Sequence, residues 1–145
     1  MPATNLLLPV FVQVLLTFIV LIQLGRARSK SLVQSRATLA NPDVAKGAFA
    51  WSDAATQASN NLKNQFEMPV LFFVAVAFAL LLKQSDMLLL ALAWGFVVMR
   101  VVHALIHLGP NIVMWRFPAY ILGVASLLAF WITLMLRVLN GTAVV

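Results

Sequence analysis

Residues 87–109 read MLLLALAWGFVVMRVVHALIHLG, an apolar run that contains Arg100. A second apolar run, residues 61–82, reads NLKNQFEMPVLFFVAVAFALLL and contains Glu67. Both runs are long enough to cross a membrane, which takes about 20 residues of helix. A charged side chain inside a membrane helix costs roughly 2.5–3.5 kcal/mol on insertion scales, so it usually faces protein and has a partner. We therefore expect both charges to lie inside a helical bundle.

The polar side chains of each run fall on one helical face. Arg100, His103 and His107 are spaced i, i+3 and i+7, and residues three or four apart are neighbours on a helix. The other run repeats this spacing with Asn60, Lys63 or Asn64, and Glu67. Two polar stripes on apolar helices indicate the walls of an intramembrane site.

Composition places the whole chain in a membrane. Of its 145 residues, 63% are hydrophobic and 10% are charged, and the mean hydropathy is +0.98. This predicts an all-α integral membrane protein. The net charge of +6 does not indicate nucleic-acid binding, because the basic residues cluster between apolar runs without interleaved aromatic residues. The chain has no cysteine, which excludes disulfides, thiolate metal sites and a cysteine nucleophile.

Four apolar runs predict a single four-helix membrane domain over residues 1–145. We expect spans at about residues 6–25, 66–83, 87–108 and 118–139, with a polar loop at about residues 26–63. The loop is rich in Lys and Arg, so the positive-inside rule places it in the cytoplasm and both termini on the other side. All four helices then bring polar side chains to the cytoplasmic face.

Turn and capping signals refine these boundaries. We expect Gly25 to end the first span and Pro118 to lie in the first turn of the fourth. Ser52 or Asp53 is expected to cap a helix that leads into the second span. The link 83–86 is so short that the second and third spans are expected to form a tight antiparallel hairpin.

Five short motifs follow one another along the chain. They are Gly25-Arg26-x-Arg28, Ala40-Asn41-Pro42-Asp43, Lys63-Asn64-x-x-Glu67-x-Pro69, Arg100-x-x-His103-x-x-x-His107-Leu-Gly and Arg116-x-x-x-Tyr120. In this order, on a chain of this length, the set resembles the MAPEG family, the membrane-associated proteins of eicosanoid and glutathione metabolism. The resemblance covers nearly the whole chain. It implies a homotrimer of four-helix subunits that binds glutathione between neighbouring subunits, near the cytoplasmic face.

The resemblance also implies roles for single residues. Arg116 matches the arginine credited with stabilising the glutathione thiolate. The other positions expected to bind or orient glutathione are Arg26, Lys63, Asn64, Glu67, Arg100, His103, His107 and Tyr120. The chain is then expected to be a bacterial-type, multi-pass inner-membrane transferase or peroxidase. Its second substrate is expected to be a lipophilic electrophile or hydroperoxide that arrives through the bilayer.

The residue types suit this ligand. Glutathione carries two carboxylates, one ammonium and one thiol at neutral pH. Arg26, Lys63, Arg100 and Arg116 supply cations, and arginine grips a carboxylate with two donors. Glu67 is expected to meet the ammonium. An arginine beside the sulfur lowers the pKa of the thiol, because an opposite charge favours the ionised form.

Structural alternatives stand beside each of these roles. Glu67 and Arg100 alternatively form a helix–helix salt bridge that fixes the bundle. His103 and His107 alternatively serve as interhelical hydrogen-bonding groups. We predict no metal site, because these are the only two histidines and Glu67 is the only carboxylate within a span.

The sequence is compatible with two other function classes. Asn60, His107 and Phe117 depart from residues common in the family, which favours a non-catalytic membrane scaffold or interaction subunit. A small transporter or channel lined by Glu67 and Arg100 is the third interpretation. Four spans without an inverted repeat argue against a secondary transporter.

Overall fold

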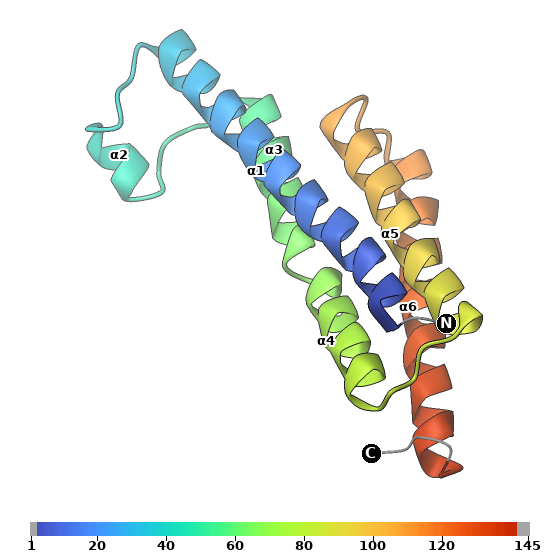
Figure 1. Ribbon diagram of the computed structural model, residues 1–145. Helices are drawn as coiled ribbons and strands as arrows, with labels where there is room; N and C mark the ends of the chain where they lie inside the picture. The colour runs from blue at the N-terminus through green and yellow to red at the C-terminus, as the bar shows by residue number, and fades with distance from the viewer. Residues whose placement is uncertain (1–2, 142–145) are drawn as a thin grey trace.

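The computed structural model describes residues 3–141, and this part of the chain is helical with no strand (Figure 1). The elements are η1 (Ala3–Leu6), α1 (Leu7–Ser35), α2 (Pro42–Ala45), α3 (Asp53–Gln65), α4 (Met68–Leu81), α5 (Met87–Leu108) and α6 (Val113–Leu139). Four helical stretches are long and apolar enough to cross a membrane: Thr4–Ser35, Asp53–Leu81, Met87–Leu108 and Val113–Leu139. The predicted all-α chain with four spans is confirmed.

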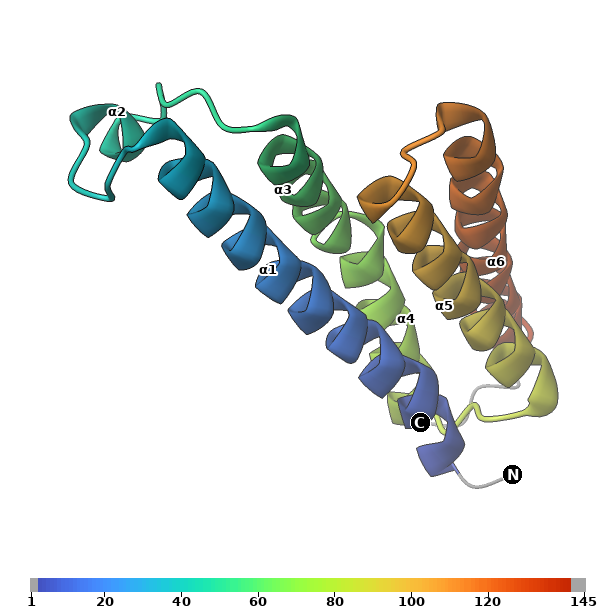
Figure 2. The same cartoon turned by 90° about the horizontal axis from the view of Figure 1, so that it is seen from above.

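The helices form two closely packed antiparallel pairs. α1 packs against α3, and α5 packs against α6, while contacts of α1 with α5 join the pairs into one bundle. Figures 1 and 2 show the start of α1 and the end of α6 at one end of the bundle. The segment that carries α2 lies at the opposite end. This segment is the long connection between α1 and α3.

The first helix is longer than expected. α1 does not end at Gly25 but continues to Ser35. A glycine destabilises a helix by only about 1 kcal/mol. This cost is too small to end a helix whose later residues are bonded to another part of the chain. Beyond Gly25, Ser31 Oγ accepts a 3.0 Å hydrogen bond from the backbone N–H of Ser52 and so connects α1 to the start of α3. The segment expected as a loop at residues 26–63 is therefore mostly helix.

The second span is two helices rather than one. α3 begins as predicted, with the Ser52 side chain accepting a 3.4 Å backbone hydrogen bond in the first turn. The helix then breaks at residues 66–67 before α4 begins. Pro69 explains the break, because it has no N–H for the carbonyl of Gln65 and its ring crowds that carbonyl. The break leaves Glu67 exposed at a bend.

The fourth span also begins earlier than expected. α6 starts at Val113, so Pro118 lies inside the helix and not in its first turn. Proline removes one hydrogen bond, to the carbonyl of Met114. Met114 lies at the exposed start of the helix, and the loss is smallest where the carbonyl is not buried.

The second and third spans are antiparallel, as the short link requires. Their backbones, however, do not pack tightly against each other. α4 meets α5 through the stacked rings of Phe72 and Phe96, with centroids 4.8 Å apart. The closest approach is instead between α5 and α6. A Cβ added at Gly123 would lie 3.3 Å from Cβ of Met99. Small residues allow such close helix packing in membranes.

A chain of buried amides connects three helices. Gln13 Nε2 on α1 donates to Gln65 Oε1 on α3 at 2.9 Å, and Gln65 Nε2 donates to Asn61 Oδ1 at 3.1 Å. Asn61 Nδ2 then donates to the carbonyl of Ala104 on α5 at 3.2 Å. These side chains are at most 1% exposed. Because polar groups are costly to leave unpaired in an apolar interior, the chain fixes α3 between its neighbours.

An ion pair closes the end of the bundle at which α5 begins and α6 ends. The Arg137 guanidinium on α6 contacts the Asp86 carboxylate, which also caps α5 by accepting from the backbone N–H of Leu89 at 2.9 Å. Burial alone raises the pKa of Asp86. The hydrogen bonds from Leu89 and Arg137 outweigh burial, so the pKa lies below its ordinary value of 3.8.

This ion pair predicts a loss of stability in acid. A carboxyl with a lowered folded-state pKa contributes stability above its unfolded pKa and loses it as the pH falls through the folded-state value. We therefore expect the melting temperature of the detergent-solubilised protein to drop by a few degrees below about pH 4. Asp86→Asn should weaken this dependence, because the amide oxygen still caps α5 but does not titrate. The exposed Asp43 provides the matched control: Asp43→Asn should keep the wild-type profile. An Asp86→Asn profile equal to wild type would contradict the assignment.

Candidate functional site

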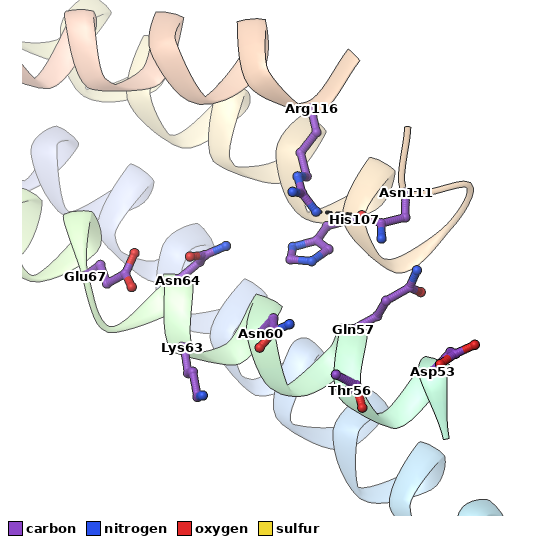
Figure 3. A pocket seen from close by; sticks show the side chains of 10 residues that line it. All are labelled: Asp53, Thr56, Gln57, Asn60, Lys63, Asn64, Glu67, His107, Asn111 and Arg116. Atoms are coloured by element: carbon purple, nitrogen blue, oxygen red, sulfur yellow. Dashed lines mark hydrogen bonds between the residues drawn. The ribbon is translucent and has the colours of Figure 1, made fainter. Parts of the chain in front are cut away.

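A polar pocket of about 620 Å³ lies between α3 and the facing ends of α5 and α6 (Figure 3). It is lined by Asp53, Thr56, Gln57, Asn60, Lys63, Asn64, Glu67, His107, Asn111 and Arg116. It lies at the end of the bundle that carries the long α1–α3 connection. Its volume is within the roughly 300–1,000 Å³ range of small-molecule sites.

Side chains of α3 and the following bend form one wall of the pocket. They recur every three or four residues, which keeps them on one helical face. Figure 3 shows Asp53 and Glu67 at opposite ends of this wall. The pocket therefore has a carboxylate at each end and amides between them.

The other wall comes from the end of α5 and the start of α6. Arg116 is half-buried, and its Nη1 donates to Asn111 Oδ1 at 2.6 Å. Asn111 has a φ of 50°, a left-handed conformation that asparagine tolerates better than most residues. This bond uses one of the five guanidinium N–H donors, so Arg116 presents an oriented cation toward the α3 wall.

The site carries both signs of charge. Lys63 and Arg116 are cations and Asp53 and Glu67 are carboxylates, while Gln57, Asn60, Asn64 and Asn111 contribute amides. Amides both donate and accept hydrogen bonds. Within residues 3–141, no group of three or more His, Cys, Asp or Glu side chains is placed to hold a metal ion. The arrangement suits a zwitterionic organic ligand.

The structure brings part of the predicted set together. The pocket includes Lys63, Asn64, Glu67, His107 and Arg116. Arg100 and His103 are 1% and 4% exposed and lie behind the lining. Tyr120 is half-buried, with its ring centroid 5.7 Å from that of His103. Arg26 is exposed on α1 and does not line the pocket.

Within residues 3–141, Arg100 and Glu67 do not form the helix–helix salt bridge that stood as the structural alternative. Arg100 Nη2 donates instead to the backbone carbonyl of Asn64 at 2.7 Å. The last carbonyls of a helix lack intrahelical partners, and the break before Pro69 creates such carbonyls next to the guanidinium. Glu67, which lies in the break itself, is exposed and lines the pocket.

The alternative of interhelical hydrogen bonding describes the contacts of His103. Its Nδ1 lies 3.2 Å from the carbonyl oxygen of Arg116. A carbonyl only accepts, so Nδ1 carries the proton of this bond. His103 Nε2 and His107 Nδ1 are buried without a hydrogen-bond partner in the part of the chain that the structure describes.

Four lining residues belonged neither to the predicted site residues nor to the predicted polar stripe that begins at Asn60: Asp53, Thr56, Gln57 and Asn111. The first three continue the spacing of Asn60 and Asn64 toward the start of α3, so the stripe extends farther than we expected. Asn111 had no such signal. It belongs to a turn, where helical periodicity says nothing about side-chain direction.

These features define a multi-pass membrane protein with a mixed-charge pocket at one end of its helical bundle. The model of the MAPEG family matches residues 6–136 of the 145-residue chain. The chain belongs to the MAPEG family, as its motifs predicted. The comparisons with curated proteins and with solved structures found no match.

Proposed function

We propose that this protein is a membrane-bound glutathione-dependent transferase or peroxidase in which Arg116 stabilises the thiolate. Its second substrate is a lipophilic electrophile or hydroperoxide. The observation that carries the proposal is the oriented guanidinium of Arg116, which faces a wall of carboxylates and amides across the pocket. Membership of the MAPEG family is consistent with it.

The pocket offers a partner for each charged group of glutathione. Glu67 or Asp53 would accept hydrogen bonds from the ammonium, and Lys63 would attract a carboxylate. The amides would bond the peptide groups. Arg116 would then meet the sulfur, where a fixed positive charge favours the thiolate over the thiol.

Two reactions follow from a bound thiolate. In conjugation, the sulfur attacks an electrophilic carbon, a carbon–sulfur bond forms and a leaving group such as chloride departs with the bonding electrons. In peroxide reduction, the sulfur attacks the terminal hydroperoxide oxygen and the oxygen–oxygen bond breaks. A second glutathione then completes the disulfide, giving one alcohol and one water. Both reactions begin with the same thiolate, so the proposal covers both.

We further propose that the pocket is completed by a neighbouring copy in a homotrimer, in an inner membrane with the site near the cytoplasmic face. Glu67 and Lys63 are exposed within a helical stretch that is long and apolar enough to cross a membrane, and exposed charges at membrane depth favour a protein partner. Arg26 is exposed on α1 and is available to reach the pocket of a neighbour. In this arrangement both termini are non-cytoplasmic.

Calorimetric titration of the detergent-purified protein with reduced glutathione tests the proposal. We expect saturable binding that weakens about tenfold in Glu67→Gln, because an ionic hydrogen bond to the ammonium becomes a neutral one. Asp43→Asn is the matched control, since it makes the same change at an exposed position outside the pocket, and it should bind like wild type.

The absence of binding in the wild type would favour the alternative of a non-catalytic membrane scaffold. Phe117 gives that alternative its structural basis, because this exposed aromatic residue offers no hydroxyl next to Arg116. Binding that is equal in wild type and Glu67→Gln would instead reject the assignment of Glu67 to the ammonium.

A further inference from the structure

We propose that Arg100 and His103 are positioning residues that fix the two walls of the pocket to α5. The geometry of the pocket carries this inference, and its consequence for glutathione rests on the proposed function. Both residues lie on one face of α5, the helix that packs against both α3 and α6. Each donates a hydrogen bond to a backbone carbonyl of a lining residue: Asn64 on α3 and Arg116 on α6.

Arg100 bonds the α3 wall at the end of the helix. The break before Pro69 leaves the last carbonyls of α3 without their usual helical donors. The backbone N–H of Phe66 donates to the carbonyl of Lys63 at 2.9 Å, and Arg100 Nη2 donates to the carbonyl of Asn64 at 2.7 Å. The guanidinium thus caps α3 with a charge-assisted bond, which is stronger than a neutral one. The side chains of Asn64 and Glu67 on either side of the break both line the pocket.

His103 fixes the α6 wall through a hydrogen bond to the backbone of Arg116, the residue proposed to stabilise the thiolate. Its Nδ1–H donates to the carbonyl of Arg116 at 3.2 Å, while the side chain of the same residue donates to Asn111. Arg116 is therefore fixed at both its backbone and its guanidinium. A catalytic group displaced by about 1 Å can lose a hundredfold in rate, so this bond bears on the chemistry without touching the ligand.

The alternative role of Arg100 and His103 is direct contact with glutathione, through nitrogen atoms that make no hydrogen bond to either wall. Arg100 Nε and Nη1 and His103 Nε2 are buried and have no hydrogen-bond partner within residues 3–141. A ligand that reached behind the lining would bind there. The two roles use different atoms of the same side chains, which allows variants to separate them.

His103 offers a matched pair of substitutions. The amide nitrogen of Asn lies at the bond position of Nδ1, and that of Gln lies near the position of Nε2. A positioning role through Nδ1 predicts that His103→Asn keeps glutathione affinity within about threefold, whereas His103→Gln lowers it about tenfold. Ligand contact through Nε2 predicts the reverse order.

A second readout does not require glutathione. Hydrogen–deuterium exchange of the unliganded protein should show faster exchange over residues 113–121 in His103→Gln and near wild-type exchange in His103→Asn, because only Asn retains the donor to the Arg116 carbonyl. If the wild type does not bind glutathione, the proposed function fails, and this exchange pattern still decides the positioning role.

Arg100 is tested in the same two ways. Arg100→Lys keeps one charged donor for the Asn64 carbonyl, and Arg100→Met keeps the unbranched stem without a donor. We expect faster exchange over residues 64–68 and about tenfold weaker glutathione binding in Arg100→Met, with Arg100→Lys close to wild type. If Arg100→Met does not fold, the His103 pair still tests the inference.

Two results would overturn the inference. One is an affinity order in which His103→Gln binds glutathione better than His103→Asn. The other is exchange over both wall segments that is unchanged in His103→Gln and Arg100→Met.

Discussion

Arg116→Ala should abolish the ultraviolet thiolate absorbance of the glutathione complex at neutral pH. An unperturbed thiol has a pKa near 8.5, so only a few per cent is ionised at pH 7. A nearby guanidinium lowers such a pKa by roughly 1–3, and a lowering of about 2 makes the thiolate the main form at pH 7. Without Arg116 the bound glutathione should return to the thiol, while Lys63 and the amides of the pocket keep much of the affinity.

The conservative change separates charge from geometry. Arg116→Lys should retain part of the absorbance, because an ammonium still favours the anion but lacks the forked donors that reach both the sulfur and Asn111. Arg36→Ala, which removes an exposed cation outside the pocket, should leave the absorbance unchanged. Equal thiolate absorbance in wild type and Arg116→Ala would refute the mechanism. Tight binding without thiolate in either protein would support the non-catalytic alternative.

Gly123→Leu should destabilise the bundle by about 3 kcal/mol, the upper end of the usual cost of overpacking. Even a single Cβ at this position lies 3.3 Å from Cβ of Met99 and 3.7 Å from the carbonyl of Phe96. A leucine side chain would therefore push α5 and α6 apart. Because these helices also form one wall of the pocket, we expect glutathione binding to be lost together with stability.

The same substitution at a second glycine provides the control. Nothing lies within 4 Å of a Cβ added at Gly25, and this glycine is exposed inside α1. Gly25→Leu should keep or raise stability, since leucine is the better helix former. Melting curves in detergent should place Gly123→Leu roughly 10 °C below Gly25→Leu. Equal melting temperatures would show that the α5–α6 contact is looser than its geometry indicates.

The four spans and the start of α3 could be predicted from local sequence. Long apolar runs predict membrane helices because bilayer thickness sets their length. Ser52 predicts the start of α3 because a side-chain oxygen satisfies the unpaired N–H groups of the first turn. The continuation of α1 past Gly25 could not be predicted this way, and the contact there between Ser31 and Ser52 joins residues 21 positions apart in the sequence.

The candidate site also combines features that the sequence predicts with features that only the structure shows. Spacing placed Lys63, Asn64 and Glu67 on one face of a helix, and they line one wall of the pocket. Spacing could not show that Arg100 would bond the Asn64 carbonyl rather than the Glu67 carboxylate. That choice depends on the break before Pro69, which leaves the Asn64 carbonyl without its helical donor, while Glu67 still lines the pocket.

The sequence by itself determined that this chain is a four-span MAPEG protein with polar stripes on two of its helices. Helix periodicity and hydropathy are local properties, and the family motifs are properties of the sequence alone. Only the tertiary structure decided which polar groups face the pocket and which hold its walls. A buried donor takes whichever acceptor lies within about 3 Å, and that acceptor is set by the packing of α5 against α3 and α6, not by spacing along any one helix.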